Sequence, residues 1–250
     1  SGSQGSPIDI CGAVGFQLPL FQTAAWDLLR PVSILNNGHT IQVNIGFDKP
    51  TTEVGGLHTL VGRGTNSSTH RWVVEQVHFH WGRKGRNDEG SEHYIQGQRY
   101  PLEAHFVHYN SAYGSSVAEA AASGKADALL VIGVLFELGL QQGEPAALTE
   151  IAKGVAAAAK TPSPLHTNVR LSDIFETVGS YYAYGGSLTT PGCNEIVTWI
   201  VMETPRVVTQ GTLDKFKAAT ANPPETAVSA HGHAGLIADL GNYRSLQPKG

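Results

Sequence analysis

The chain has 250 residues, of which 41% are hydrophobic and 15% charged, and its formal net charge at pH 7 is −4. This length suits one large domain whose core needs no disulfide or metal to hold it together. The weak net charge and scattered basic residues give no support for a nucleic-acid partner. The longest apolar stretch, residues 128–140, contains Glu137 and is shorter than the roughly 20 residues of a membrane span, so we expect none.

Short strands dominate the predicted elements. Alternating or continuous apolar runs, rich in β-branched and aromatic side chains, predict strands over residues 41–47, 72–81, 102–109, 129–137 and 196–203. Helices are predicted over residues 145–159, which are alanine-rich with proline in the first turn, and over residues 212–219. Because glycine and proline are spread throughout and neither a linker nor a repeat is visible, we predict one β-rich domain with a few surface helices.

Cysteines and a sequon bear on the compartment. Cys11 and Cys193 could form one disulfide, which would place the protein outside the cytosol, or they could be two buried thiols. Asn66 begins an N-glycosylation sequon, and no signal peptide is visible. The two cysteines, the Asn66 sequon and the low lysine content favour a secreted protein, either extracellular or periplasmic.

The most informative segment carries two histidines. On a strand, His78 and His80 point to one face and lie about 6–7 Å apart along it, which suits two ligands of one metal ion. A second predicted strand carries Glu103 and His105 on a shared face. If the two strands are neighbours, His105 completes a set of three neutral imidazoles, which is typical of a catalytic zinc site with one open position. A histidine on a strand is more often a core residue, so spacing alone leaves both interpretations open.

Seven segments in order resemble the α-class carbonic anhydrases. They are 6–10 (SPIDI), 35–39 (LNNGH), 77–82 (VHFHWG), 90–93 (GSEH), 103–110 (EAHFVHYN), 186–191 (GSLTTP) and 197–201 (VTWIV), and 242–244 (NYR) fits as well. The resemblance implies a mainly β, single domain over residues 1–250. Its large, twisted, mostly antiparallel sheet would have about ten strands, a few surface helices and a conical zinc cleft. The family's N-terminal segment is expected to be missing, and Tyr243 stands where tryptophan is common.

The resemblance also implies an activity. The chain would be a carbonate dehydratase, a lyase that reversibly hydrates carbon dioxide to bicarbonate and a proton through a zinc-bound hydroxide. A weak esterase side activity and inhibition by sulfonamides and anions would accompany it. Zn²⁺ would be bound by His78, His80 and His105, the set from which a bound water with a pKa of about 7 is expected.

Further roles come from the resemblance alone. Gln76, Glu103 and the backbone carbonyl of Asn242 would orient the three zinc ligands. Thr189 would orient the hydroxide and bond to Glu92, and His39 would carry the proton to solvent. The carbon dioxide pocket would be lined by Val107, Val131, Leu188, Thr190, Val197 and Trp199. The family's usual disulfide does not support a Cys11–Cys193 bond.

Two alternatives remain. The first is a non-catalytic carbonic-anhydrase-like binding or scaffold domain, although such relatives usually lose a zinc histidine and all three are present here. The second is a different zinc hydrolase, but neither Gly-x-Ser-x-Gly nor His-Glu-x-x-His occurs. The remaining histidines are interpreted as structural or exposed: His93 and His108 facing away from the metal, and His58, His70, His166, His231 and His233 at the surface.

Overall fold

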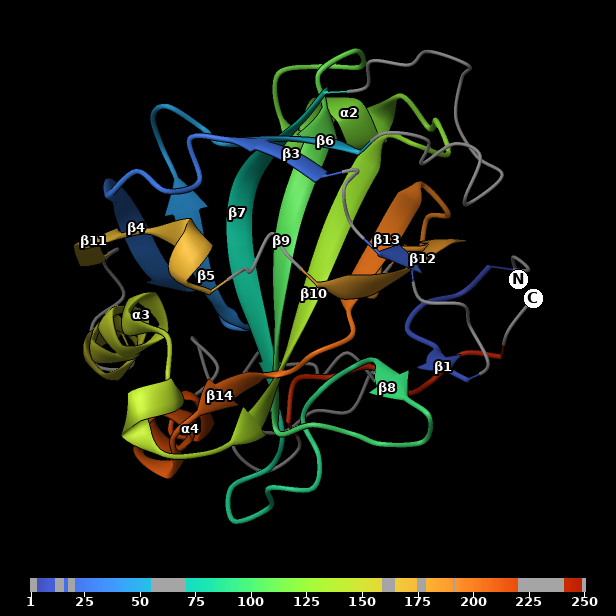
Figure 1. The fold of residues 1–250 in the computed structure, drawn as a ribbon. Helices are drawn as coiled ribbons and strands as arrows, with labels where there is room; N and C mark the ends of the chain where they lie inside the picture. Colours follow the sequence, from blue (N-terminus) through green and yellow to red (C-terminus); the bar gives the residue numbers. More distant parts are fainter. Residues whose placement is uncertain are drawn as a thin grey trace.

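The structure is a computed structural model that describes residues 4–11, 16–17, 21–54, 71–158, 165–174, 179–190, 192–219 and 241–248. Strands are the predominant regular elements of the described chain, and a few helices lie at its edges (Figure 1). The strands are β1 (Asp9–Ile10), β2 (Phe16–Gln17), β3 (Phe21–Ala24), β4 (Arg30–Asn36), β5 (Ile41–Ile45), β6 (Thr51–Val54), β7 (Arg71–Trp81), β8 (Tyr94–Ile95), β9 (Leu102–Asn110), β10 (Leu129–Leu138), β11 (Leu165–Val169), β12 (Ser180–Gly186), β13 (Val197–Met202) and β14 (Arg206–Val208). The helices are α2 (Val117–Ala122), α3 (Ala146–Ala158) and α4 (Gln210–Lys217), with 3₁₀ turns η1 (Gln141–Gly143) and η2 (Leu171–Asp173).

One large sheet organises the molecule. Within the described residues it contains twelve strands, with the main order β11-β4-β5-β7-β9-β10-β13-β12-β2; β14 pairs with β10, and β6 joins β3 to β7. Most neighbours are antiparallel, while β10 runs parallel to β13 and β14. The prediction of a mainly β fold around a large, mostly antiparallel sheet is therefore confirmed.

A β-bulge in β7 sets which side chains face the core. The pairing of β7 with β9 shifts between Val74 and Gln76, so Glu75 is an extra residue. Val74 is fully buried before the bulge, and Val77 and Phe79 are fully buried after it. The buried positions thus change from even to odd numbers, and the even-numbered residues after the bulge face the opposite side of the sheet.

The face of the sheet that carries Val77 and Phe79 is covered by α3 and α4. Ile151 and Val155 of α3 are fully buried in the main core cluster, and Phe216 of α4 lies with its ring centroid 4.9 Å from that of Phe79.

The predicted strand over residues 41–47 is too long, because β5 ends at Ile45 and Phe47 is 83% exposed beyond it.

A buried carboxylate joins the beginnings of the two helices. Glu144, two residues before the start of α3, accepts hydrogen bonds at Oε1 from the backbone N–H and hydroxyl of Thr209, the N-cap of α4, at 2.7 and 2.9 Å. Its Oε2 accepts from the hydroxyls of Thr149 and Thr212 at 2.8 and 3.0 Å. Burial alone would raise the pKa of Glu144, but these hydrogen bonds lower it below its ordinary value.

Replacing Glu144 with glutamine is expected to lower the free energy of unfolding by about 1–3 kcal/mol at pH 7, because an amide cannot accept from all these donors. The folded-state pKa is lowered, so this stabilisation is present above the unfolded pKa of about 4.3 and is lost as the pH falls through the folded pKa. Urea unfolding at pH 7 and pH 3 measures both effects. Glu150→Gln, at a half-buried α3 position where Glu150 is ion-paired with Lys153, is the control and should change little. Equal stability of wild type and Glu144→Gln at pH 7 would contradict this account.

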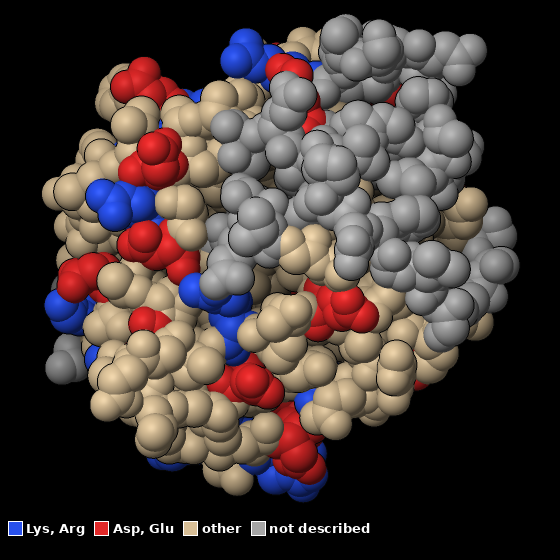
Figure 2. Space-filling view, in the orientation of Figure 1, with Lys and Arg blue, Asp and Glu red and all other residues tan. Residues whose placement is uncertain are grey.

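Charges of both signs are interspersed over the described residues of the face in Figure 2. The net charge of −4 is thus not gathered into one large acidic field on that face. Among the described residues, no helix is both long and apolar enough to cross a membrane.

Candidate metal centre

Three histidines from the middle of the sheet converge on one point. His78 and His80 lie on β7 after the bulge, and His105 lies on β9 directly opposite His78 in the strand register. One ring nitrogen from each histidine lies within 4.8 Å of the others. The ring centroids are 5.1 Å apart for His78–His80 and His78–His105, and 4.5 Å apart for His80–His105.

Hydrogen bonds at the outer nitrogens orient two of the rings. The Nδ1 of His78 donates to Gln76 Oε1 at 3.0 Å, and the Nδ1 of His80 donates to the backbone carbonyl of Asn242 at 2.7 Å. Each bond places the ring proton on Nδ1, which leaves the Nε2 lone pair facing inward. The structure therefore places Gln76 and Asn242 behind the histidines for which the sequence predicted them.

His105 is held in the other tautomer by a buried carboxylate. Its Nε2 donates to Glu103 Oε1 at 2.8 Å, so its Nδ1 faces inward. Glu103 is fully buried, and its Oε2 also accepts from the backbone N–H groups of Glu92 and His93 at 2.7 and 2.9 Å. Burial would raise the pKa of Glu103, but His93, His105 and their hydrogen bonds outweigh it and hold the pKa well below its usual range. The carboxylate is therefore ionised.

The inward nitrogens fit a metal ion. The Nδ1 of His105 and the Nε2 of His78 lie 3.3 Å apart although both carry lone pairs, and the Nε2 of His80 is buried without a hydrogen-bond partner among the described residues. Burial lowers the pKa of all three rings, to about 4 for His80 and well below the usual range for His78, which His80 and His105 also repel. Three neutral imidazoles that face one another in this way need a cation between them, and this donor set suits zinc.

His93 belongs to the support of this centre, which corrects the prediction that it faces away with a merely structural role. Its Nδ1 bonds to Glu103 Oε1 at 2.7 Å, and its Nε2 bonds to the Tyr184 hydroxyl at 2.7 Å. The Tyr184 hydroxyl lies 3.1 Å from Ser6 Oγ, so a buried chain of hydrogen bonds runs from Ser6 to His105. Strand alternation could not place His93 because it lies before β8, outside the two histidine-bearing strands. His108, unlike His93, faces away from the three histidines as predicted, and its Nε2 bonds to the Thr52 hydroxyl on the opposite face of the sheet.

Gly133 leaves room for the Glu103 carboxylate. It lies on β10 opposite His105, and a Cβ atom added there would lie 2.9 Å from Glu103 Oε1. Gly133→Ala is therefore expected to displace the carboxylate and to speed metal loss about 10- to 100-fold. The rate at which a chelator removes the metal measures this. Gly46→Ala is the control, since a Cβ there would meet nothing within 4 Å. Metal loss from Gly133→Ala at the wild-type rate would show that the carboxylate tolerates the methyl group.

Glu92 lies beside His80, with its Oε1 3.5 Å from His80 Nδ1, and Thr189 lies next to Glu92. Glu92 is fully buried, and its Oε1 accepts from the backbone N–H of Arg244 at 2.7 Å. Burial raises the pKa of Glu92, while the Thr189 hydroxyl comes close enough to lower it. Glu92 Oε2 nevertheless has no well-formed hydrogen bond among the described residues, so the predicted Thr189–Glu92 pair is brought together without ideal geometry.

The predicted pocket residues form an apolar wall on the His105 side. Val131 is paired with Val107 on β9 and with Trp199 on β13, and the Trp199 ring centroid lies 4.8 Å from that of His105. These residues, with Val197, are at most 5% exposed. Leu188 packs against the buried apolar cluster that contains these residues, whereas Thr190 is exposed.

His39 is exposed in the turn between β4 and β5. Its backbone N–H donates to Asn37 Oδ1 at 3.0 Å, and its carbonyl accepts from Asn242 Nδ2 at 3.2 Å. The neighbouring Thr40 hydroxyl donates to the carbonyl of Phe79, the residue between the two β7 histidines, at 2.5 Å. The turn is thus fastened to the strand that carries the metal ligands.

The two cysteines correct another prediction. Cys11 and Cys193 are both exposed thiols, so they are neither bonded to each other nor buried. Cys11 follows β1, whereas Cys193 lies in the turn after Thr190 and its Sγ donates to the Thr190 carbonyl at 3.6 Å. The expectation of a secreted protein therefore loses the disulfide as support. His166 is exposed as predicted, and the predictions for Asn66, His58, His70, His231 and His233 lie outside the described residues.

Fold and site together define a β-rich domain with three histidines at the middle of its sheet that could hold a metal ion. Residues 1–250 match the eukaryotic-type carbonic anhydrase family, and the chain belongs to that family. It is 33% identical over 219 residues to carbonic anhydrase 7 of Mus musculus, covering 87% of this chain and 77% of that protein. It is 31% identical over 221 residues to carbonic anhydrase-related protein of Homo sapiens (88% and 70% covered), and 32% identical over 206 residues to carbonic anhydrase 3 of Bos taurus (81% and 73% covered).

Proposed function

We propose that the chain catalyses the reversible hydration of carbon dioxide to bicarbonate and a proton, with Zn²⁺ held by His78, His80 and His105. The observation that carries the proposal is the convergence of three neutral ring nitrogens, each set in its tautomer by a hydrogen bond on its far side. Zinc bound by three imidazoles supplies a hydroxide source at neutral pH, because it lowers the pKa of bound water to about 7.

The chain's own residues have distinct tasks in this proposal. Carbon dioxide is apolar, and the wall of Val107, Val131 and Trp199 beside His105 offers an apolar surface on which it can lie. Thr189 lies near Glu92, and its hydroxyl oxygen would accept a hydrogen bond from the hydroxide that attacks carbon dioxide. This bond would fix the direction of attack. Sulfonamide and anion inhibitors are expected to compete at the same position.

The test is stopped-flow carbon dioxide hydration by the purified protein before zinc removal, after removal and after return of zinc. Activity that disappears with the metal and returns with it supports the proposal. Folded, zinc-loaded protein that hydrates carbon dioxide no faster than buffer would overturn it. The alternative of a non-catalytic binding domain would then remain, and one of the relatives bears the name carbonic anhydrase-related protein.

His39 is proposed as the group that moves the proton to solvent. It is exposed on a turn that is hydrogen-bonded to β7, and imidazole is the side chain best suited to relay protons at neutral pH. His39→Ala is expected to lower kcat about tenfold or more in dilute buffer while kcat/KM changes little, because only proton release is slowed. His166→Ala, at an exposed position on β11, is the matched control. A parallel fall of kcat and kcat/KM in His39→Ala would contradict the shuttle role.

A further inference from the structure

A short irregular segment, residues 241–244, reaches the metal centre at two points. The carbonyl of Asn242 accepts from His80, and the backbone N–H of Arg244 donates to the Glu92 carboxylate. The segment has neither helical nor strand hydrogen bonding of its own. The Asn242 N–H donates to the Trp81 carbonyl at 3.2 Å, and the side chains of the segment make the further contacts that hold it against the rest of the molecule.

Asn242 and Arg244 fasten the two ends of this segment. The Asn242 side chain accepts from the Trp81 N–H at 2.7 Å and donates to the Phe79 carbonyl at 2.8 Å, so it pairs with β7 like an added strand. The Arg244 guanidinium donates to the Ser6 carbonyl at 2.6 Å. Tyr243 lies between Asn242 and Arg244, and it is held through its aromatic ring.

Arg99 provides that hold. Its guanidinium carbon lies 3.7 Å from the ring centroid of Tyr243 and 5.2 Å from that of Tyr94, so the cation is placed against two aromatic rings. Its Nε donates to the Ser91 carbonyl at 2.9 Å, which fixes the direction of the side chain. The Tyr243 hydroxyl donates to Glu89 Oε2 over a long distance of 3.4 Å.

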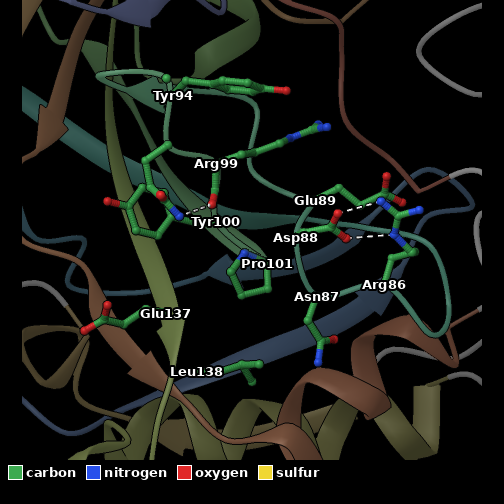
Figure 3. Close-up of a pocket in the computed structure, with 12 residues that line it drawn as sticks. Arg86, Asn87, Asp88, Glu89, Tyr94, Arg99, Tyr100, Pro101, Glu137 and Leu138 are labelled. Carbon is green, nitrogen blue, oxygen red and sulfur yellow. Dashed lines mark hydrogen bonds and ion pairs between the residues drawn. The ribbon is translucent and has the colours of Figure 1, made fainter.

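The Arg99 side chain lines an open groove (Figure 3), and none of the three histidines is among the lining residues. The groove measures about 1130 Å³ and is lined by residues 86–89, 94, 97–101, 137 and 138. In Figure 3, Arg99 and Tyr94 extend in the same direction, while Arg86 is turned to Asp88, to which it is ion-paired at 2.5 Å. Two arginines of one groove thus differ: Arg99 contacts Tyr243, and Arg86 contacts a neighbour in its own loop.

We infer that Arg99 is a positioning residue for the metal centre and acts through the ring of Tyr243. By holding Tyr243, it keeps the flanking Asn242 carbonyl on His80 and the Arg244 amide on Glu92. The inference rests on the proposed zinc site, because its effect is on how long the centre keeps its metal. It makes no demand on which reaction the metal supports.

The experiment measures the rate at which excess chelator removes zinc from the loaded protein. Arg99→Ala and Tyr243→Leu are each expected to lose zinc about threefold to tenfold faster than wild type, as the loss of a stacked cation would predict. The double variant should be no faster than the faster single variant, because both remove one interaction. Tyr243→Trp keeps an aromatic face and should retain the wild-type rate. Arg86→Ala, in the same groove, should stay within about twofold of wild type.

The outcomes separate cleanly. Equal zinc loss from wild type and Arg99→Ala, or rate increases of Arg99→Ala and Tyr243→Leu that multiply in the double variant, would overturn the inference and leave the zinc site intact. Wild-type protein that holds no zinc would instead overturn the proposed site. If Arg99→Ala does not fold by circular dichroism, the Tyr243→Leu and Tyr243→Trp pair decides: equal rates in these two variants contradict the inference.

Discussion

Substituting His105 with alanine is expected to eliminate metal retention and carbon dioxide hydration together. The two remaining neutral imidazoles, His78 and His80, cannot complete the set, so the loss should exceed the roughly 10- to 100-fold that removal of an outer hydrogen-bond partner costs. The variant also deprives the buried Glu103 carboxylate of one donor, and we expect the metal-free protein to lose about 1–3 kcal/mol of stability.

Zinc content after dialysis, stopped-flow hydration and urea unfolding measure these three effects of His105→Ala. His166→Ala on β11 is the control and should match wild type in all of them. Stoichiometric zinc in folded His105→Ala would mean that the ion is bound elsewhere, and the three-histidine centre would have to be abandoned.

Thr189→Ala is expected to slow hydration about 100-fold while zinc stays bound, since the hydroxyl acts on the direction of attack rather than on the metal. Thr189 is 7% exposed and lies against the buried Glu92, so the methyl group of alanine leaves the surrounding packing nearly intact. Thr189→Ser keeps the hydroxyl and should recover most of the rate. Thr167→Ala on the edge strand β11 serves as a control.

Kinetics of these variants distinguish orientation from binding. A fall in kcat with unchanged KM for Thr189→Ala fits an interaction made in the transition state. A variant that hydrates carbon dioxide at the wild-type rate would remove Thr189 from the proposed mechanism, and a variant that loses zinc would make Thr189 a support of the metal.

The sequence predicted correctly that His78 and His80 share one face of a strand, because alternation along a strand is a local property. His78 and His80 follow the bulge at Glu75, so strict alternation holds across them even though it fails three residues before His78. The pairing of β7 with β9, which brings His105 opposite His78, is a long-range property that spacing left open and family resemblance supplied.

Other features could not be read from local patterns. His93 lies outside the strands that carry the three histidines. Its bond to Glu103 depends on the conformation of the loop between β7 and β8. The space that Gly133 leaves for a carboxylate, and the contact of Arg99 with Tyr243, join residues far apart in the chain. Short apolar patterns also extend past the true strand end, as with Phe47, because an isolated apolar residue after a turn carries no sign of its exposure.

The bond from His80 to Asn242 spans 162 positions of the chain, which has a consequence for synthesis. A nascent chain can pair β7 with β9 and gather all three histidines long before Asn242 leaves the ribosome. Until Asn242 arrives, His80 lacks the acceptor that sets its tautomer, and Glu92 lacks the amide of Arg244. We therefore expect high-affinity metal uptake only after residues 242–244 have been synthesised and have packed against His80 and Glu92.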